Sequence, residues 1–425
     1  MAMISPPNDR QQMAQGADDL DPVRRARTSA TAAALERALS GRALSRADAV
    51  GLIACPDEDL AALCAAARLV RAVGKGRTVS FSPKVFIPLT RLCRDTCGYC
   101  TFRTDPRTDP RLYMTPEQVL AVARAGERLG CTEALFTLGE RPEQRFFEAR
   151  TWLVGRGHAS TLSYLREMSA LVLRETGLWP HLNPGTMGRG EMAKLRDVSA
   201  SMGLMLENVS ERLCGPGGPH EHAPSKHPRA RLRTLDAAGE LRVPFPTGLL
   251  IGIGETPSER VDTLLAIRDS HARWGQVQEV IIQNFRAKPS TPMADTPEPG
   301  TDDVMRAAAV ARLLLGPAAN IQVPPNLTAR DFPRYLQAGI NDWGGISPLT
   351  IDYVNPEAPW PRISLLRAVT EDAGLALKAR LPVYPEYVLH RSEYIAPALR
   401  DRLRAAADAD GYAEGGLARH GSAVT

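Results

Sequence analysis

Short apolar segments alternate with amphipathic segments over most of this 425-residue chain. The amphipathic segments have the period of helices of ~10–15 residues, and some begin with a capping box such as Thr115-Pro116-Glu117-Gln118. Strands that alternate with helices in this way pair in parallel, which predicts an α/β fold. The expected strands are 84–89, 134–138, 179–182, 201–206, 245–253, 277–284, 321–323 and 342–346.

Eight such strands close most naturally into a complete, TIM-like (β/α)8 barrel. A six-stranded open barrel with an added C-terminal part is the near alternative. We expect the barrel over residues 78–390, after a helical extension over 29–77. Residues 1–28 are polar and aperiodic, which predicts a disordered tail, and 391–425 are expected to form a C-terminal helix and tail.

The composition is that of a soluble globular protein, with 44% hydrophobic and 24% charged residues. A formal net charge of +4 gives no reason to expect nucleic acid or an anionic membrane as a partner. No apolar run approaches the ~20 residues of a membrane span, and we expect no secretory signal. Seven cysteines, three of them clustered, fit a reducing compartment, so we expect a cytoplasmic protein.

The clustered cysteines Cys93, Cys97 and Cys100 follow the first expected strand in the spacing C-x-x-x-C-x-x-C. Thiolates are preferred ligands of soft metals and iron–sulfur clusters. Three thiolates on one short loop would leave one iron of a four-iron cluster open to a small chelating molecule. A zinc site fits less well, because structural zinc takes four ligands and the loop contains no fourth Cys or His.

This spacing, with Tyr99 directly before the last cysteine, resembles the signature of radical S-adenosylmethionine enzymes. The resemblance implies that the three cysteines hold a [4Fe-4S] cluster and that S-adenosyl-L-methionine chelates its open iron. Reductive cleavage would then give a 5'-deoxyadenosyl radical that removes a hydrogen atom from the substrate. It also places Tyr99 among the cofactor-binding residues.

Gly139-Glu140 follows the second expected strand and resembles the family's glycine-glycine-glutamate motif. In that motif, backbone and acid hold the methionine amino group. Leu138 stands where the family has its first glycine, and a strand-ending Gly-Glu pair is also a common turn.

Further candidates follow the next three expected strands. Gly252 and Gly254 fit the family's fifth-strand pattern near the adenine, where glycines let the backbone approach a flat base. Asn183 and Glu207 could hydrogen-bond ribose hydroxyls or substrate, and either could equally satisfy loop backbone.

Substrate binding is expected at the end of the sixth strand, from Gln283, Asn284 and Arg286. Two amides and a guanidinium suit a polar heterocycle with many carbonyl and amide groups. His220 and His222 lie in a loop rich in Gly and Pro, which predicts a flexible surface loop rather than a metal site.

A narrower resemblance covers roughly residues 78–390. It is carried, in order, by FIPLTRLCRDTCGYCTF, TLGERPE, HLNPGTM, SMGLMLEN, TGLLIGIGET, EVIIQNFRAKP, PPNL, DWGGISPLT and VNPEAPWP. Together these are similar to the CofG type of 7,8-didemethyl-8-hydroxy-5-deazariboflavin (FO) synthase, a carbon–nitrogen lyase of coenzyme F-420 biosynthesis.

The resemblance implies that 5-amino-5-(4-hydroxybenzyl)-6-(D-ribitylimino)-5,6-dihydrouracil is converted to the deazaflavin, ammonia, 5'-deoxyadenosine and methionine. A companion of the CofH type would supply this adduct, and a low-potential donor would supply electrons. The chain has a single cysteine motif, so the companion is expected to be separate. Other radical enzymes (CofH, aminofutalosine or biotin synthase types) and a non-catalytic iron–sulfur or zinc scaffold remain open.

Overall fold

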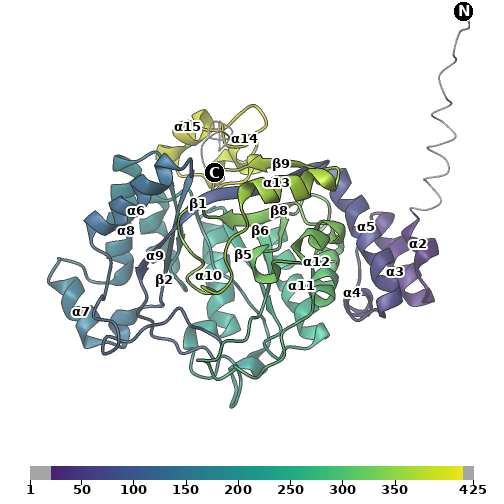
Figure 1. Cartoon of the computed structure of the whole chain (residues 1–425), viewed down its shortest axis with the longest axis horizontal. Helices are drawn as coiled ribbons and strands as arrows, with labels where there is room; N and C mark the ends of the chain where they lie inside the picture. Colours follow the sequence, from purple (N-terminus) through teal and green to yellow (C-terminus); the bar gives the residue numbers. More distant parts are fainter. Residues whose placement is uncertain (1–20, 415–425) are drawn as a thin grey trace, which may run out of the picture.

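The computed structural model describes residues 21–414, and its centre is a nearly closed barrel of eight parallel strands (Figure 1). The order around the barrel is β4-β3-β2-β1-β8-β7-β6-β5. The eight-stranded prediction is therefore confirmed over the six-stranded alternative. The strands are β1 Thr78–Thr90, β2 Glu133–Leu138, β3 Trp179–Asn183, β4 Ser201–Met202, β5 Phe245–Ile251, β6 Val277–Asn284, β7 Ile321–Gln322 and β8 Asp342–Ile346.

The barrel closes between β4 and β5 through single hydrogen bonds rather than a regular ladder. Met202 N donates to Pro244 O at 3.3 Å, and Leu204 N donates to Pro246 O at 3.2 Å. Farther along, Glu207 forms an isolated parallel bridge with Leu249. This loose seam explains why the strand expected over 201–206 has ladder pairing only at its first two residues.

Helices cover the outside of the barrel (Figure 1). The close packing of α6 shows how: its Gly126 lies so near β1 that an added Cβ would come within 2.3 Å of Val85. Between β7 and β8 the covering segment is a 3-10 helix, Phe332–Ala338, with Pro333 in its first turn. The covering helices are α6 Pro116–Arg128, α7 Phe147–Val154, α8 Thr161–Glu175, α9 Arg189–Leu195, α10 Pro228–Glu240, α11 Pro257–Trp274, α12 Thr301–Leu315 and α13 Ile363–Asp372.

An N-terminal group of four helices packs beside α11 and α12 (Figure 1). They are α2 Pro22–Arg25, α3 Ser29–Leu39, α4 Arg46–Ile53 and α5 Asp57–Lys75. The prediction of disorder was wrong for residues 21–28, because buried Asp59 accepts hydrogen bonds from Arg27 N at 2.5 Å and Thr28 Oγ1 at 2.7 Å. The rest of the tail predicted to be disordered, 1–20, lies outside the described residues.

The C-terminal segment covers the amino-terminal end of the barrel. Strand β9 Ala376–Ala379 pairs in parallel with the first residues of β1, and α14 Pro385–Leu389 and α15 Pro397–Ala405 follow it (Figure 1). Its buried side chains form a small second core against Trp179 and Ala200. Within 21–414, no helix is long and apolar enough to cross a membrane.

Candidate active site

The cysteine loop begins where β1 ends and lies directly against the end of β2. Glu140 N donates a hydrogen bond to Cys93 Sγ at 3.2 Å. A Cβ added to Gly139 would lie 1.9 Å from Leu92 O and 2.8 Å from Cys93 Cβ. Only glycine permits this approach, so Gly139 fixes the cysteine loop against the neighbouring strand.

The surroundings of the loop affect the protonation of two of its thiols and offer contacts that a thiolate could accept. Burial raises the pKa of Cys93 to about 11 and also raises that of Cys97, so that both would be protonated at neutral pH without a metal. A backbone N–H aimed at sulfur suits a thiolate ligand, as does Lys226, whose charge opposes the rise at Cys97. Binding of iron would therefore displace protons from these groups.

No three His, Cys, Asp or Glu side chains between residues 21 and 414 converge on a single-ion site. A four-iron cluster has no such requirement, because each thiolate binds a different iron.

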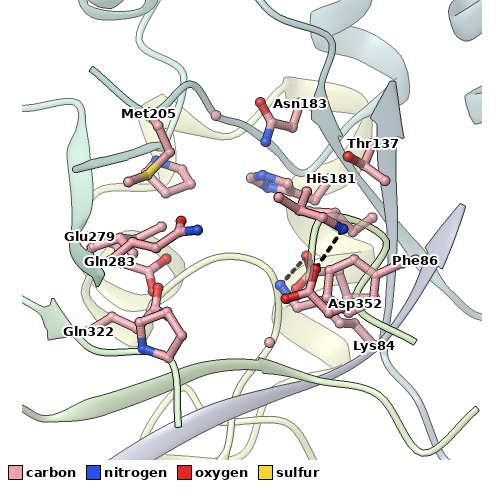
Figure 2. A pocket seen from close by; sticks show the side chains of 18 of the residues that line it. Lys84, Phe86, Thr137, His181, Asn183, Met205, Glu279, Gln283, Gln322 and Asp352 are labelled. Carbon is pink, nitrogen blue, oxygen red and sulfur yellow. Dashed lines mark hydrogen bonds and ion pairs between the residues drawn. The ribbon is translucent and has the colours of Figure 1, made fainter. Parts of the chain in front are cut away.

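A cavity of about 240 Å³ lies beside the three cysteines and runs into the mouth of the barrel. Sequence-predicted residues meet here: it is lined by Cys93, Cys97, Cys100, Tyr99, Gly139, Glu140, Asn183, Glu207 and Gln283. A second cavity of about 210 Å³ lies deeper in the barrel (Figure 2). Asn183 and Gln283 line both cavities, and neither side chain has a hydrogen-bond partner among the described residues. Two free amides therefore stand where the cavities meet.

Glu140 lines the cavity beside the cysteines, which we call the outer cavity, and its carboxylate already has contacts within the protein. Its carboxylate accepts hydrogen bonds from Thr186 N at 2.9 Å and Thr186 Oγ1 at 2.6 Å, and Arg141 lies 3.5 Å away. A carboxylate has about four acceptor positions, so these contacts leave room for a further donor. They also fix the orientation of the carboxylate before any ligand binds.

Glu207 is the centre of a buried charge network. It accepts short hydrogen bonds from Tyr99 Oη and Lys226 Nζ and lies 3.1 Å from His220 Nε2. Burial alone would raise the pKa of Glu207, but Lys226 and Arg231 hold it well below its usual value. These contacts favour a role in fixing Tyr99 and Lys226, and ribose binding by Glu207 stays a prediction.

The backbone of Glu207 is unusual as well, with φ of 64°. Its N–H donates to Gly248 O at 2.8 Å, and its carbonyl accepts from Leu250 N at 3.2 Å. The left-handed conformation, uncommon outside glycine, turns the chain so that one residue both closes the barrel and directs a carboxylate into the site.

The loop over residues 215–227 is not the flexible surface loop that its Gly and Pro content predicted. Thr96 N donates to His222 O and Gly98 N to Pro219 O, both at 2.8 Å, which binds this loop to the cysteine loop. His220 is only 3% exposed. The sequence reading missed His220 and Lys226 as site residues, and the only signal for them was their place after the fourth strand.

The glycines after β5 shape a turn and line neither cavity. Gly252 has φ of +93° and Gly254 of +97°, and a Cβ on Gly252 would clash with Pro299. Gly252 N donates to the Glu255 carboxylate at 2.8 Å. Contact of either glycine with adenine stays a prediction.

Two of the three residues predicted to bind substrate also lie off the cavities. Alternation along β6 places Gln283 inside the barrel and Asn284 on the outer side, where it is 2% exposed. Arg286 donates to Leu327 O at 2.6 Å and pairs with Glu298 at 3.2 Å. A substrate role for Asn284 and Arg286 stays a prediction without geometric support.

The comparisons with known proteins agree with this architecture. A family model described as the radical SAM superfamily matches residues 87–267. FO synthase of Mycobacterium tuberculosis is 51% identical over 399 residues, which cover 90% of this chain and 47% of that protein. This chain thus spans about half the length of the FO synthases it matches. The 7,8-didemethyl-8-hydroxy-5-deazariboflavin synthase of Methanopyrus kandleri is 55% identical over 310 residues, covering 73% of this chain and 92% of that protein.

Solved structures support the fold. The FeFe-hydrogenase maturase HydG from Carboxydothermus hydrogenoformans superposes with a TM-score of 0.67 at 18% identity, covering 92% of this chain and 90% of the other. Methylornithine synthase superposes with a TM-score of 0.61 at 19% identity, covering 81% of this chain and 97% of the other.

Proposed function

Since this chain belongs to the 7,8-didemethyl-8-hydroxy-5-deazariboflavin synthase family of radical S-adenosylmethionine enzymes, we propose that it forms the deazaflavin FO from the hydroxybenzyl–ribityl-uracil adduct. The other products are ammonia, 5'-deoxyadenosine and methionine. One observation carries the proposal: the cavity beside the three cysteines shares Asn183 and Gln283 with a second cavity inside the barrel. In this proposal the cofactor and the substrate bind in these two adjacent cavities.

In this proposal Cys93, Cys97 and Cys100 hold a [4Fe-4S] cluster, and S-adenosylmethionine occupies the outer cavity. The bound cluster and S-adenosylmethionine supply an adenosyl radical for hydrogen-atom abstraction. Glu140, oriented by Thr186, is placed to receive the methionine ammonium, because charge pairing with a fixed carboxylate is favourable.

An apolar group of side chains packs around the cysteine loop and limits access of water from the β5 and β6 side. It consists of Tyr99, Leu213, Leu250, Ile253 and Phe285, with Met293 against it. Exclusion of water matters here because a reactive radical must meet its substrate before any competing reaction.

The second, deeper cavity, which we call the inner cavity, has a lining that suits the adduct. Its walls carry amides and charged groups for the uracil and ribityl parts, and apolar rings that suit the hydroxybenzyl part. Phe86 and Trp360 stack on each other at 5.3 Å between ring centroids on one wall. Gln283 and Asn183 would orient the adduct at the boundary between the cavities, where correct placement contributes much of the rate.

We further propose a companion enzyme of the CofH type as the source of the adduct and a low-potential electron donor. The M. tuberculosis relative has about twice the length matched here, which leaves room for such a second activity in one chain. We also propose a cytoplasmic location, because none of the seven cysteines takes part in a disulfide.

The test is an anaerobic assay of the purified, reconstituted protein with the adduct, a reductant and S-adenosylmethionine, read by mass spectrometry. We expect deazaflavin and 5'-deoxyadenosine. Tyrosine and the ribityl-diaminouracil should give no deazaflavin unless the companion is added. Formation of the adduct itself from tyrosine would move the chain to the CofH type, and failure to cleave S-adenosylmethionine would leave only a scaffold role.

A further inference from the structure

His181 is a buried imidazole on β3 that points into the inner cavity and plays no part in the function proposed so far. Figure 2 shows its ring directed toward the open centre of the cavity, across from Gln283. It lies two residues before Asn183 on the same face of the strand, so it stands deeper in the barrel than the boundary between the cavities.

Hydrogen bonding fixes which ring nitrogen carries the proton. Ser201 Oγ donates its only proton to Pro382 O at 2.8 Å. His181 Nδ1 lies 2.6 Å from the same oxygen and must therefore be the donor of that contact. Nε2 is left with a lone pair, and within residues 21–414 it has no hydrogen-bond partner.

The surroundings keep this imidazole neutral. Burial lowers the pKa of His181 to about 4, against an opposite effect of Glu133, while the charges of Lys84 and Arg380 lower it further. Lys84 and Glu133 are themselves paired at 2.7 Å and do not bond to the imidazole. A neutral acceptor, held in one orientation and one tautomer, thus faces the place proposed for the substrate.

We propose that Nε2 of His181 accepts the proton that the adduct loses when its new ring closes. This inference rests on the proposed function, because it concerns the same cavity and the same adduct. It adds a catalytic residue that accepts this proton, a role that the proposed function assigns to no residue of the cysteine loop.

The step balances as follows. Conversion of adduct to deazaflavin removes ammonia and two further hydrogens. One leaves as an atom, taken by the adenosyl radical. The second leaves as a proton and an electron when a ring carbon of the hydroxybenzyl group exchanges its C–H bond for a C–N bond. The proton forms an N–H bond at Nε2, and a bound iron–sulfur cluster, part of the proposed function, would supply the oxidant that takes up the electron.

A weak base is sufficient for this transfer. The carbon that loses the proton belongs to a ring that regains aromaticity, so its C–H bond is strongly acidic at that moment. General-base catalysis by a positioned side chain contributes ~10²–10⁴-fold. The imidazolium formed would pass its proton on to solvent as the product leaves.

The matched variant is His181→Asn, whose amide can still donate to Ser201 but presents no acceptor at the position of Nε2. With adduct, reductant and S-adenosylmethionine, we expect iron content, melting temperature and 5'-deoxyadenosine formation close to wild type. Deazaflavin formation should fall by at least ~100-fold. The ratio of deoxyadenosine to deazaflavin should rise accordingly, a change that mere loosening of the fold would not produce.

Ser201→Ala is the second variant, because it keeps the imidazole but removes the hydroxyl group that fixes which ring nitrogen carries the proton. We expect a several-fold loss of deazaflavin at unchanged iron content, and this variant decides the matter if His181→Asn does not fold. Wild-type yield of deazaflavin per deoxyadenosine in the variant that folds would overturn the inference. If wild type makes no deazaflavin from the adduct, the proposed function fails instead, so the two failures are distinguishable.

Discussion

Replacement of Gly139 by alanine should separate the cysteine loop from β2 without touching a cysteine. The new Cβ would lie 1.9 Å from Leu92 O, a backbone atom that cannot rotate away. Non-bonded atoms pack best at ~3.5 Å or more, so the two segments must move apart by roughly 1.5 Å. Overpacking of this kind costs about 1–3 kcal/mol. The displacement carries Cys93 with it and lengthens its 3.2 Å contact with Glu140 N.

The assay is iron and sulfide content after anaerobic reconstitution, together with thermal unfolding of the protein before iron is added. Gly139→Ala should retain less than half of the wild-type iron and unfold a few degrees earlier. Gly51→Ala is the matched control, because Gly51 lies in α4 with no heavy atom within 4 Å of an added Cβ. That change should be neutral or stabilising by up to ~1 kcal/mol. Wild-type iron content and S-adenosylmethionine cleavage in Gly139→Ala would refute the packing argument.

Three further outcomes are expected. Alanine at any one loop cysteine should abolish a full [4Fe-4S] cluster, whereas Cys131→Ala should not, as checked by iron content and electron paramagnetic resonance. The pKa of Glu207 is held well below that of an unfolded glutamate, so its stabilisation is complete above ~4.3 and is lost as pH falls below this value. The difference in melting temperature between wild type and Glu207→Gln should therefore shrink between pH 6 and 3. Arg380→Ala should destabilise the fold by ~3–5 kcal/mol in denaturant titrations, because Asp342 loses its buried partner at 2.7 Å.

The barrel was predictable because its signals are local. Capping boxes begin several helices, such as α6 at Thr115, and buried apolar runs mark strands, so many helix and strand positions follow from short windows of sequence. The predictions failed where distant residues decide the structure. Residues 21–28 looked disordered because Asp59, which holds Arg27 and Thr28, lies outside any local window.

The candidate site shows the same division. The three cysteines and Gly139-Glu140, which line one cavity in the structure, could be singled out because spacing and strand ends mark them. His220 and Lys226 were missed because a Gly- and Pro-rich composition predicts flexibility, and nothing local reveals that the loop pairs with the cysteine loop. The outward position of Asn284 could not be predicted, because the exact end of β6 decides which of two neighbouring amides faces inward, and strand ends are the least certain part of a sequence prediction.

The floor of the inner cavity could not be read from the sequence at all, because its members come from opposite ends of the chain. Lys84 and Glu133 lie early in the barrel, whereas Arg380 comes from the C-terminal segment that covers the barrel and pairs with Asp342. Only the closed barrel brings these charges together beneath the proposed substrate. The cysteines are at the other end of the two cavities. Changes at the floor should therefore alter use of the adduct while cleavage of S-adenosylmethionine continues, and changes at the cysteine loop should abolish both.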